Sequence, residues 1–358
     1  MTVVVDLDPG EVGAVPAFET HVASLVDELT RRVDGLSGAL SHQATSSARE
    51  DLGRIAAFLE RELDRSDARS VVLYASGRDD VWEELRLGQP AAPAVHAGRA
   101  FVLTPLLEAL ERDRDVILAA VSRDRGLLWR LRNDSIEPVA DLSRDGQGQH
   151  DQGGWSQARY ARSRENEALG HFRAVAHAVG EQVSRGSSTL VVVDCLDEQR
   201  SAFEGELPAH VSERMIGWTA VEAHAGPDAL RPQAEELLDA RLADERAALL
   251  DRWRQQAPAG RAASRWEEAV TAAWDGRIET ALVDGRTHDA WECPTCGRGY
   301  AAAGVCEVDA VPLEDALGGA LELVVRGTLR HGGEVRHAGE GTLDETDGVA
   351  AILRYAAG

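Results

Sequence analysis

The fold is decided by three short apolar stretches in the middle of the chain. They read DVILAAVS at residues 115–122, GLLWRLR at residues 126–132 and STLVVVDC at residues 188–195. The centre of the third is continuously apolar and β-branched, which is typical of a strand buried on both faces of a sheet. A further strand is predicted at Ser135–Leu142, with polar turns between neighbours. These residues predict a sheet at the core of the middle segment.

A long helix is predicted between the last two strands. Its apolar side chains repeat at intervals of three and four residues, as on one face of a helix; they are Leu169, Phe172, Ala176, Val179 and Val183. After the buried strand come a helix pair and another predicted strand, Trp218–Ala223. Strands that alternate with helices indicate the α/β class.

The N-terminal segment repeats this pattern. We expect strands at Thr2–Asp6, Ser70–Ala75 and Val81–Leu87, and helices at Pro16–Val33 and Ser46–Leu63, with Ser46 or Ser47 as the cap of the second helix. The Pro-Ala stretch Gly88–Gly98 is interpreted as a linker.

The C-terminal segment is also predicted to be α/β. A short helix at Thr104–Glu111 opens the middle segment, with Thr104 as cap and Pro105 at its first position, and a long charged helix at Asp228–Gln256 leads out of it. Beyond it we expect helices at Ala263–Ala273 and Leu313–Leu329, and strands at Thr280–Asp284, Asp289–Trp291 and Ala350–Tyr355. The prediction is three mixed-sheet α/β domains, 1–92, 93–226 and 227–358.

Composition excludes several classes of protein. The chain has 358 residues with 61 acidic and 38 basic side chains, every basic one an arginine, and a net charge of -23. A hydrophobic content of 44% indicates a globular rather than a disordered chain. The N-terminus lacks the basic and apolar regions of a secretory signal, and no apolar run approaches the roughly 18 residues of a membrane span. We therefore expect a cytoplasmic protein without membrane partners.

The charge is unevenly distributed. Residues 91–190 contain 13 arginines and 13 acidic residues, so the whole net charge of -23 comes from the other 258 residues. A net-acidic chain does not suit a non-specific nucleic-acid coat, because that function needs a basic surface. A neutral middle segment can still meet a polyanion at one place.

A glycine-rich loop precedes the long helix. It runs from Ser143 to Gly154 (SRDGQGQHDQGG) and has no large apolar residue. Arg159, Arg162 and Arg164 follow in the first turns of the helix, where the helix dipole favours anions over cations. One interpretation is a phosphate partner at this end; the other is a solvated loop with local pairing of the arginines to Glu165 and Glu167.

These residues resemble a known family. GGWSQARYAR, Gly153–Arg162, is similar to the GGQ-containing loop and following helix of the archaeo-eukaryotic class I release factors, and more closely to bacterial relatives of Vms/Ankzf-type peptidyl-tRNA hydrolases, Pelota and the hibernation factor Balon. Phe101–Leu131 is similar to the start of that family's middle domain, and Asp347–Gly358 to the end of its third domain. The resemblance implies a three-domain release-factor-like architecture.

The resemblance also implies a function. The family's middle domain reaches the peptidyl transferase centre, so we expect ribosomal RNA, peptidyl-tRNA and a delivering translational GTPase as partners. Gln157, with Gly153 and Gly154, would hold a water for ester hydrolysis; the other interpretation of Gln157 is a solvent-facing first-turn residue. Trp155 would stack on a nucleobase or pack as a core aromatic.

The chain departs from the family at one important position. Trp155 stands where the release factors have glutamine directly after the glycine pair. No stop-codon-reading motif is recognised in the N-terminal segment, so stop-codon decoding is not expected. Three hypotheses follow: a peptidyl-tRNA hydrolase-like factor that frees nascent peptide from stalled ribosomes; a non-catalytic A-site protein for hibernation or rescue; and an acidic α/β protein that has lost ribosome function.

A cysteine cluster lies in the last segment. Cys293, Cys296 and Cys306 stand in WECPTCGRGYAAAGVCEVDAVP, where CPTCG predicts a zinc knuckle and Asp309 takes the place of a fourth ligand. His288 is an alternative ligand, and a remnant ribbon folded without metal is the alternative structure. Structural zinc is the predicted cofactor, with no nucleotide cofactor, and Cys195 is predicted to be a core residue.

Overall fold

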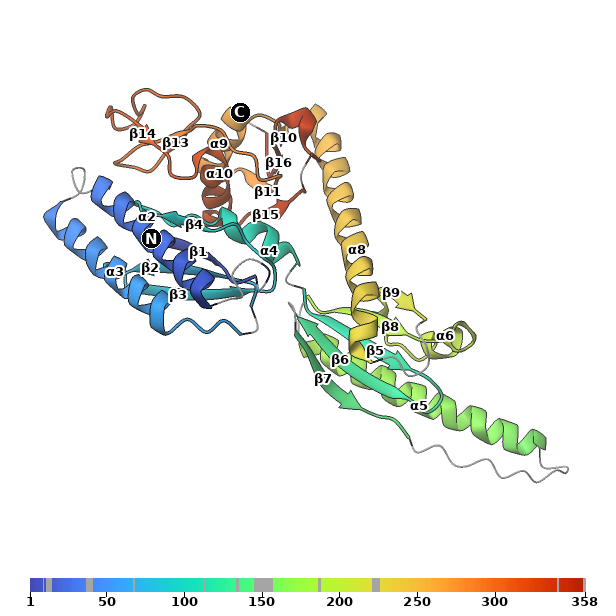
Figure 1. The fold of residues 1–358 in the computed structure, drawn as a ribbon. Coiled ribbons are helices and arrows are strands. Elements are labelled where there is room, and N and C mark those ends of the chain that lie inside the picture. Colours follow the sequence, from blue (N-terminus) through green and yellow to red (C-terminus); the bar gives the residue numbers. More distant parts are fainter. Residues whose placement is uncertain are drawn as a thin grey trace. The chain divides into compact units, whose positions relative to one another are not determined.

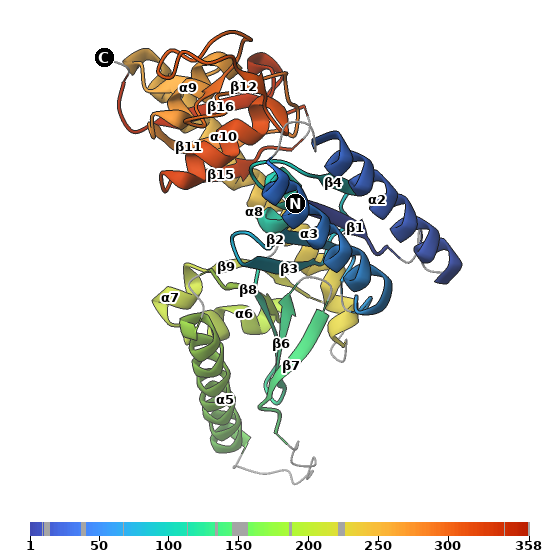
Figure 2. The ribbon, with the colours of Figure 1, turned by 90° about the vertical axis from the view of Figure 1, so that its left-hand side faces the viewer.

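The computed structural model describes residues 1–8, 10, 15–36, 41–66, 68–112, 114–132, 135–144, 157–185, 188–220, 226–339 and 341–356. The chain divides into two compact units, residues 113–244 and residues 1–112 together with 245–358. The prediction of three domains with boundaries after residues 92 and 226 stays a prediction. The α/β class is confirmed (Figures 1 and 2).

Unit 113–244 is built on a five-stranded sheet of order β7-β6-β5-β8-β9. Its strands are β5 (Val116–Val121), β6 (Gly126–Arg132), β7 (Ser135–Asp141), β8 (Leu190–Asp194) and β9 (Met215–Thr219). Strands β5, β6 and β7 pair antiparallel, whereas β5, β8 and β9 run parallel. Every residue of β5 is buried, as a central strand covered on both faces requires.

Helices cover both faces of this sheet. One face packs against α5 (Gln157–Arg185), α6 (Asp197–Glu204) and α7 (Ala209–Ser212). The other packs against the first turns of α8 (Pro227–Gln256) through Leu230 and Ala234. Cys195 follows β8 with 2% of its surface exposed, which confirms its prediction as a core residue.

The other unit contains a sheet from the N-terminal segment. Its order is β3-β2-β1-β4, all antiparallel, with β1 (Thr2–Asp6), β2 (Ser70–Ser76), β3 (Val81–Leu87) and β4 (Ala94–His96). Helices α2 (Val15–Leu36) and α3 (His42–Arg61) cover one face. Residues 101–109, which include η1 (Thr104–Leu106) and the start of α4 (Leu107–Arg112), pack on the other.

The same unit contains a second sheet, of order β10-β16-β11-β15. Its strands are β10 (Ala262–Ala263), β11 (Ile278–Val283), β15 (Glu334–His337) and β16 (Val349–Leu353). One face packs against α9 (Trp266–Trp274) and α10 (Gly319–Arg330), and the other against the end of α8 through Leu250. Short 3-10 turns lie at η2 (Ala257–Ala259) and η3 (Asp344–Thr346), and a small sheet joins β12 (Trp291–Glu292) to β13 (Gly299–Tyr300) and β14 (Glu314–Asp315).

Several predicted boundaries were wrong. Helix α3 starts at His42 because the Ser41 hydroxyl, not Ser46 or Ser47, accepts the Ala44 N–H. The interpreted linker contains β4, which pairs with β1. Helix α10 starts only at Gly319, since Gly318 and Gly319 have positive φ values of 78° and 67°. Strand β9 begins three residues before the predicted Trp218.

Candidate functional site

Near its start, α5 contains an exposed helical stem. Residues 162–167 are exposed without exception. Six consecutive residues cover more than one full turn, so no side of the helix is packed there. Burial begins at His171 and continues through Phe172 and Val175 on the sheet. The stem (residues 162–167) therefore stands clear of the core of its unit.

The chain that leads toward this stem is held in place on the sheet side. After β7, the Leu142 N–H donates to the Gly126 carbonyl at 2.7 Å, and the Arg144 N–H donates to the Asp124 carbonyl at 2.7 Å. The Arg144 guanidinium also donates to the carbonyl of Glu167 in the stem, at 3.2 Å. Arg144 is thus held both to the sheet and to α5.

The predicted loop residues are only partly within the structure. Gly153, Gly154 and Trp155 lie outside the described residues. Gln157 is the first residue of α5, and Arg159 lies in its first turn, while their side chains are outside the described part.

Arg162 and Arg164 are in the exposed stem, as their positions in the sequence predicted. Of the two acidic residues considered as local partners, Glu167 accepts a hydrogen bond from the Ser163 hydroxyl at 3.2 Å. The stem therefore places two guanidinium groups on exposed helix directly after the loop.

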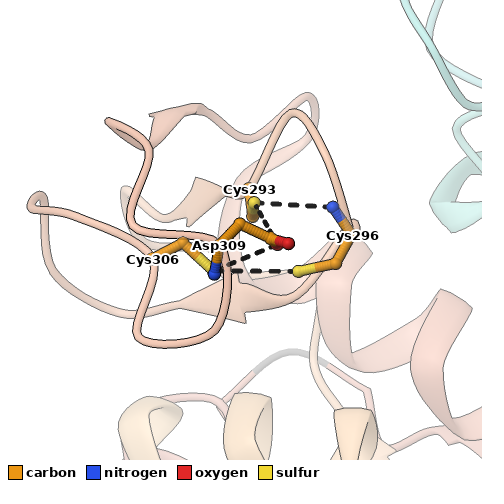
Figure 3. A group of neighbouring side chains, drawn as sticks. All are labelled: Cys293, Cys296, Cys306 and Asp309. Atoms are coloured by element: carbon orange, nitrogen blue, oxygen red, sulfur yellow. Dashed lines mark hydrogen bonds between the residues drawn. The ribbon is translucent and has the colours of Figure 1, made fainter.

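Cys293, Cys296, Cys306 and Asp309 converge on one point (Figure 3). One ligand atom from each lies within 4.8 Å of all the others. The Cys296 and Cys306 sulfurs are 3.7 Å apart, and Asp309 Oδ2 lies 3.3 Å from Cys293 Sγ and 3.5 Å from Cys306 Sγ. The four residues that spacing predicted are brought together.

Two tight turns aim these side chains inward. The Thr295 and Cys296 N–H groups donate to Cys293 Sγ at 3.4 and 3.5 Å, and the Asp309 N–H donates to Cys306 Sγ at 3.4 Å. Backbone amides directed at thiolates are the pattern of a zinc knuckle. The turns are therefore built for negatively charged sulfur.

Tyr300 supports the cluster and was missed in the sequence. Its hydroxyl donates to Cys306 Sγ at 3.4 Å and accepts the Glu307 N–H at 3.2 Å. The signal in the sequence that could have identified it was an aromatic residue between the two cysteine-containing halves of the motif. His288, the alternative ligand, instead pairs with Asp347, with Nε2 2.8 Å from Oδ2.

The donor set fits a tetrahedral metal. With Zn–S bonds of about 2.3 Å, tetrahedral geometry separates two sulfur ligands by about 3.8 Å, close to the 3.7 Å between Cys296 and Cys306. Hydrogen bonds from the Cys296 and Cys293 thiols lower the pKa of Asp309, so its carboxylate is ready as a ligand. Cys293 and Cys306 are each 2% exposed, which suits a closed structural site.

Comparison with known proteins finds a family match in the middle of the chain. Residues 102–246 match bacterial archaeo-eukaryotic release factor family 10. A curated relative, peptide chain release factor subunit 1 of Methanopyrus kandleri, is 26% identical over 243 residues, which are 63% of this chain and 59% of that protein. The match thus spans less than two thirds of the relative's length.

Solved structures similar to this chain include an archaeal translation termination factor, aRF1, with 15% identity and a TM-score of 0.28 over 99% of this chain and 92% of that one. A model of ribosome-bound archaeal Pelota and ABCE1 gives 17% identity and a TM-score of 0.44, covering 81% and 78%. Dom34 of S. cerevisiae gives 10% identity and a TM-score of 0.43, covering 83% of each chain.

Within the described residues, no helix combines the length and apolar composition that a membrane crossing needs.

Proposed function

We propose that this chain, which belongs to the bacterial branch of the archaeo-eukaryotic release factor superfamily, enters the ribosomal A site and extends residues 153–157 toward peptidyl-tRNA. It would free nascent peptides from stalled ribosomes by hydrolysis of the peptidyl-tRNA ester. The observation that carries the proposal is the exposed stem at residues 162–167, which follows that loop within the part matched to the family.

The proposed chemistry needs no general base. An ester is already activated, so a factor need only position a water molecule and stabilise the developing negative charge. Glutamine has no useful pKa, but the Gln157 side chain can hold a water as donor and acceptor together. Gly153 and Gly154 would permit close approach of the backbone to the ester.

The proposed RNA contacts follow the loop in sequence. Arg162 and Arg164 can each neutralise a phosphate, and exposed helix at this point leaves room for an RNA strand. Arg159 and Trp155 would add a phosphate contact and a stacking surface. Three arginines follow the glycine-rich loop in a neutral middle segment, whereas the rest of the chain is acidic, so the sequence favours one defined RNA site over general RNA binding.

The test is release of labelled peptide from ribosomes that carry peptidyl-tRNA in the P site. Wild type and Gln157→Ala are compared under single-turnover conditions, with ribosome binding measured in parallel. We expect wild type to release peptide and the variant to bind equally but release slowly. Equal release rates for the two proteins would remove Gln157 from the mechanism.

A second candidate is a non-catalytic A-site protein for hibernation or rescue. The displaced glutamine favours it, since Trp155 holds the position directly after the glycine pair. Ribosome binding without peptide release by wild type would support this candidate over hydrolysis. Failure to co-sediment with ribosomes at low salt would instead favour an acidic α/β protein without ribosome function.

We also propose that the cluster of Cys293, Cys296, Cys306 and Asp309 binds structural zinc. The convergence of three sulfurs and one carboxylate oxygen within 4.8 Å supports this proposal. With four protein ligands, the metal would keep no open position for catalysis. It would stabilise the small sheet of β12, β13 and β14, which has few residues of its own to bury.

A further inference from the structure

The chain passes between its two units at two places, and both lie beside the same arginine. It leaves the unit of residues 1–112 and 245–358 after Arg112 and returns to it at Glu245. The return is made within α8, which continues from Pro227 to Gln256. Arg336 is on β15, the edge strand of the sheet that α8 covers.

Arg336 contacts a carboxylate at each crossing. Its Nε lies 2.8 Å from Glu111 Oε1, and one terminal nitrogen lies 2.8 Å from Glu245 Oε2. The other terminal nitrogen lies 2.9 Å from Glu334 Oε1, on its own strand. One guanidinium therefore connects two segments that are 134 residues apart in sequence (245 − 111) to a single strand.

The contacts of Arg336 with Glu111 and Glu245 are partly sheltered from water. The side chains of Glu111 and Arg336 are 5% and 15% exposed, and that of Glu245 is 26% exposed. The second oxygen of Glu111 accepts the His337 N–H of the edge strand at 2.8 Å. A partly buried pair is costly to break, because the remaining charge is left without a partner.

The planar guanidinium group explains why this residue is an arginine. Its nitrogens point in different directions within one plane and can reach three carboxylates at once, whereas a lysine ammonium is a compact point charge. The three acceptors here come from three different elements: α4, α8 and β15.

We propose that Arg336 is a positioning residue that holds both crossings on β15 and so fixes the chain at the two points where it leaves and re-enters this unit. Its functional part rests on the proposed function, because the two crossings matter for peptide release only if the glycine-rich loop acts on peptidyl-tRNA. Its structural part does not.

Hydrogen exchange on the full chain tests the structural part. We expect Arg336→Gln to speed amide hydrogen exchange roughly tenfold or more in residues 104–112 and in residues 245–256. Loss of the ion pairs would allow both segments to open locally. Glu245→Gln should speed only the second segment. The matched control, Arg286→Gln, removes an arginine paired with Asp284 and Asp344 in the same unit and should change neither segment.

Unchanged exchange in both segments of Arg336→Gln would overturn the proposal, as would equal acceleration in β11 and α9. Should Arg336→Gln fail to fold, Glu245→Gln decides: faster exchange in residues 245–256 alone supports the proposal, and unchanged exchange there overturns it. In the release assay, Arg336→Gln should lower the release rate without weakening ribosome binding, and Arg336→Lys should restore it in part. Absence of release by wild type would refute the proposed function and leave the exchange test of Arg336 valid.

Discussion

The Glu322 carboxylate accepts the backbone N–H of Leu103, 219 residues away in sequence, at 2.9 Å to Oε2 and 3.0 Å to Oε1. The Thr104 N–H donates to the same carboxylate at 3.1 Å. Glu322 is fully buried in the first turn of α10. Burial raises its pKa to about 7, and the two backbone donors and Arg326 oppose this rise.

Stability should fall as pH rises through this range. Below pH 4.5, the ordinary value for glutamate, the carboxyl is protonated in both the folded and unfolded chain. Between pH 4.5 and 7 the unfolded chain ionises while the folded chain keeps the proton, so the contribution of Glu322 is lost by up to about 3 kcal/mol.

Denaturant unfolding at several pH values measures this loss. Glu322→Gln keeps an acceptor but cannot ionise, so its stability should change less between pH 4.5 and 7 than that of wild type. The same pH slope in both proteins would show that Glu322 is not the group responsible.

Removal of charge from the stem should weaken ribosome binding. Replacement of Arg162 and Arg164 by glutamine removes two proposed phosphate contacts, so the slope of log affinity against log salt should fall by roughly 1 to 2. Ribosome co-sedimentation across a salt series measures it. The control is Arg31→Gln with Arg32→Gln, two exposed arginines on α2.

The control pair should leave the salt dependence unchanged. If it lowers binding as much as the stem pair, the effect reflects net charge and the stem is not a specific contact.

Loss of one thiolate should release the metal. Cys296→Ser should lower bound zinc from one equivalent to almost none and lower the melting temperature, because a structural zinc site contributes directly to folding. Metal analysis after gel filtration and a thermal scan measure both. Asp309→Cys completes a four-cysteine set and should keep the metal.

The metal proposal fails if wild type purified without chelators contains no zinc and takes up none. It also fails if chelator treatment leaves the melting temperature of wild type unchanged.

Local patterns predicted much of this fold. The continuous apolar run at residues 190–193 and the 3-4 spacing from Leu169 to Val183 are set by neighbours in sequence, and both elements are confirmed. The Cys293–Cys296 turn is also local, so its spacing predicted the cluster. Elements that depend on distant partners were missed: β4 is stabilised as a strand by pairing with β1, about 90 residues earlier.

The charged residues that join distant segments show the same limit. Glu111, Glu245, Glu322 and Arg336 look like ordinary charged residues of an acidic chain, and they become distinctive only when the fold brings them together. The roles of Gly153, Gly154, Trp155 and Gln157 stay predictions.

The most direct test of the central claim is the single-turnover rate of peptide release from P-site peptidyl-tRNA by Gln157→Ala. Gln147→Ala serves as the control from the same glycine-rich loop. We predict a rate about 10²-fold below wild type for Gln157→Ala, the scale of losing one transition-state contact, with ribosome binding unchanged and with Gln147→Ala close to wild type. Wild-type ribosome binding without any peptide release would contradict the claim.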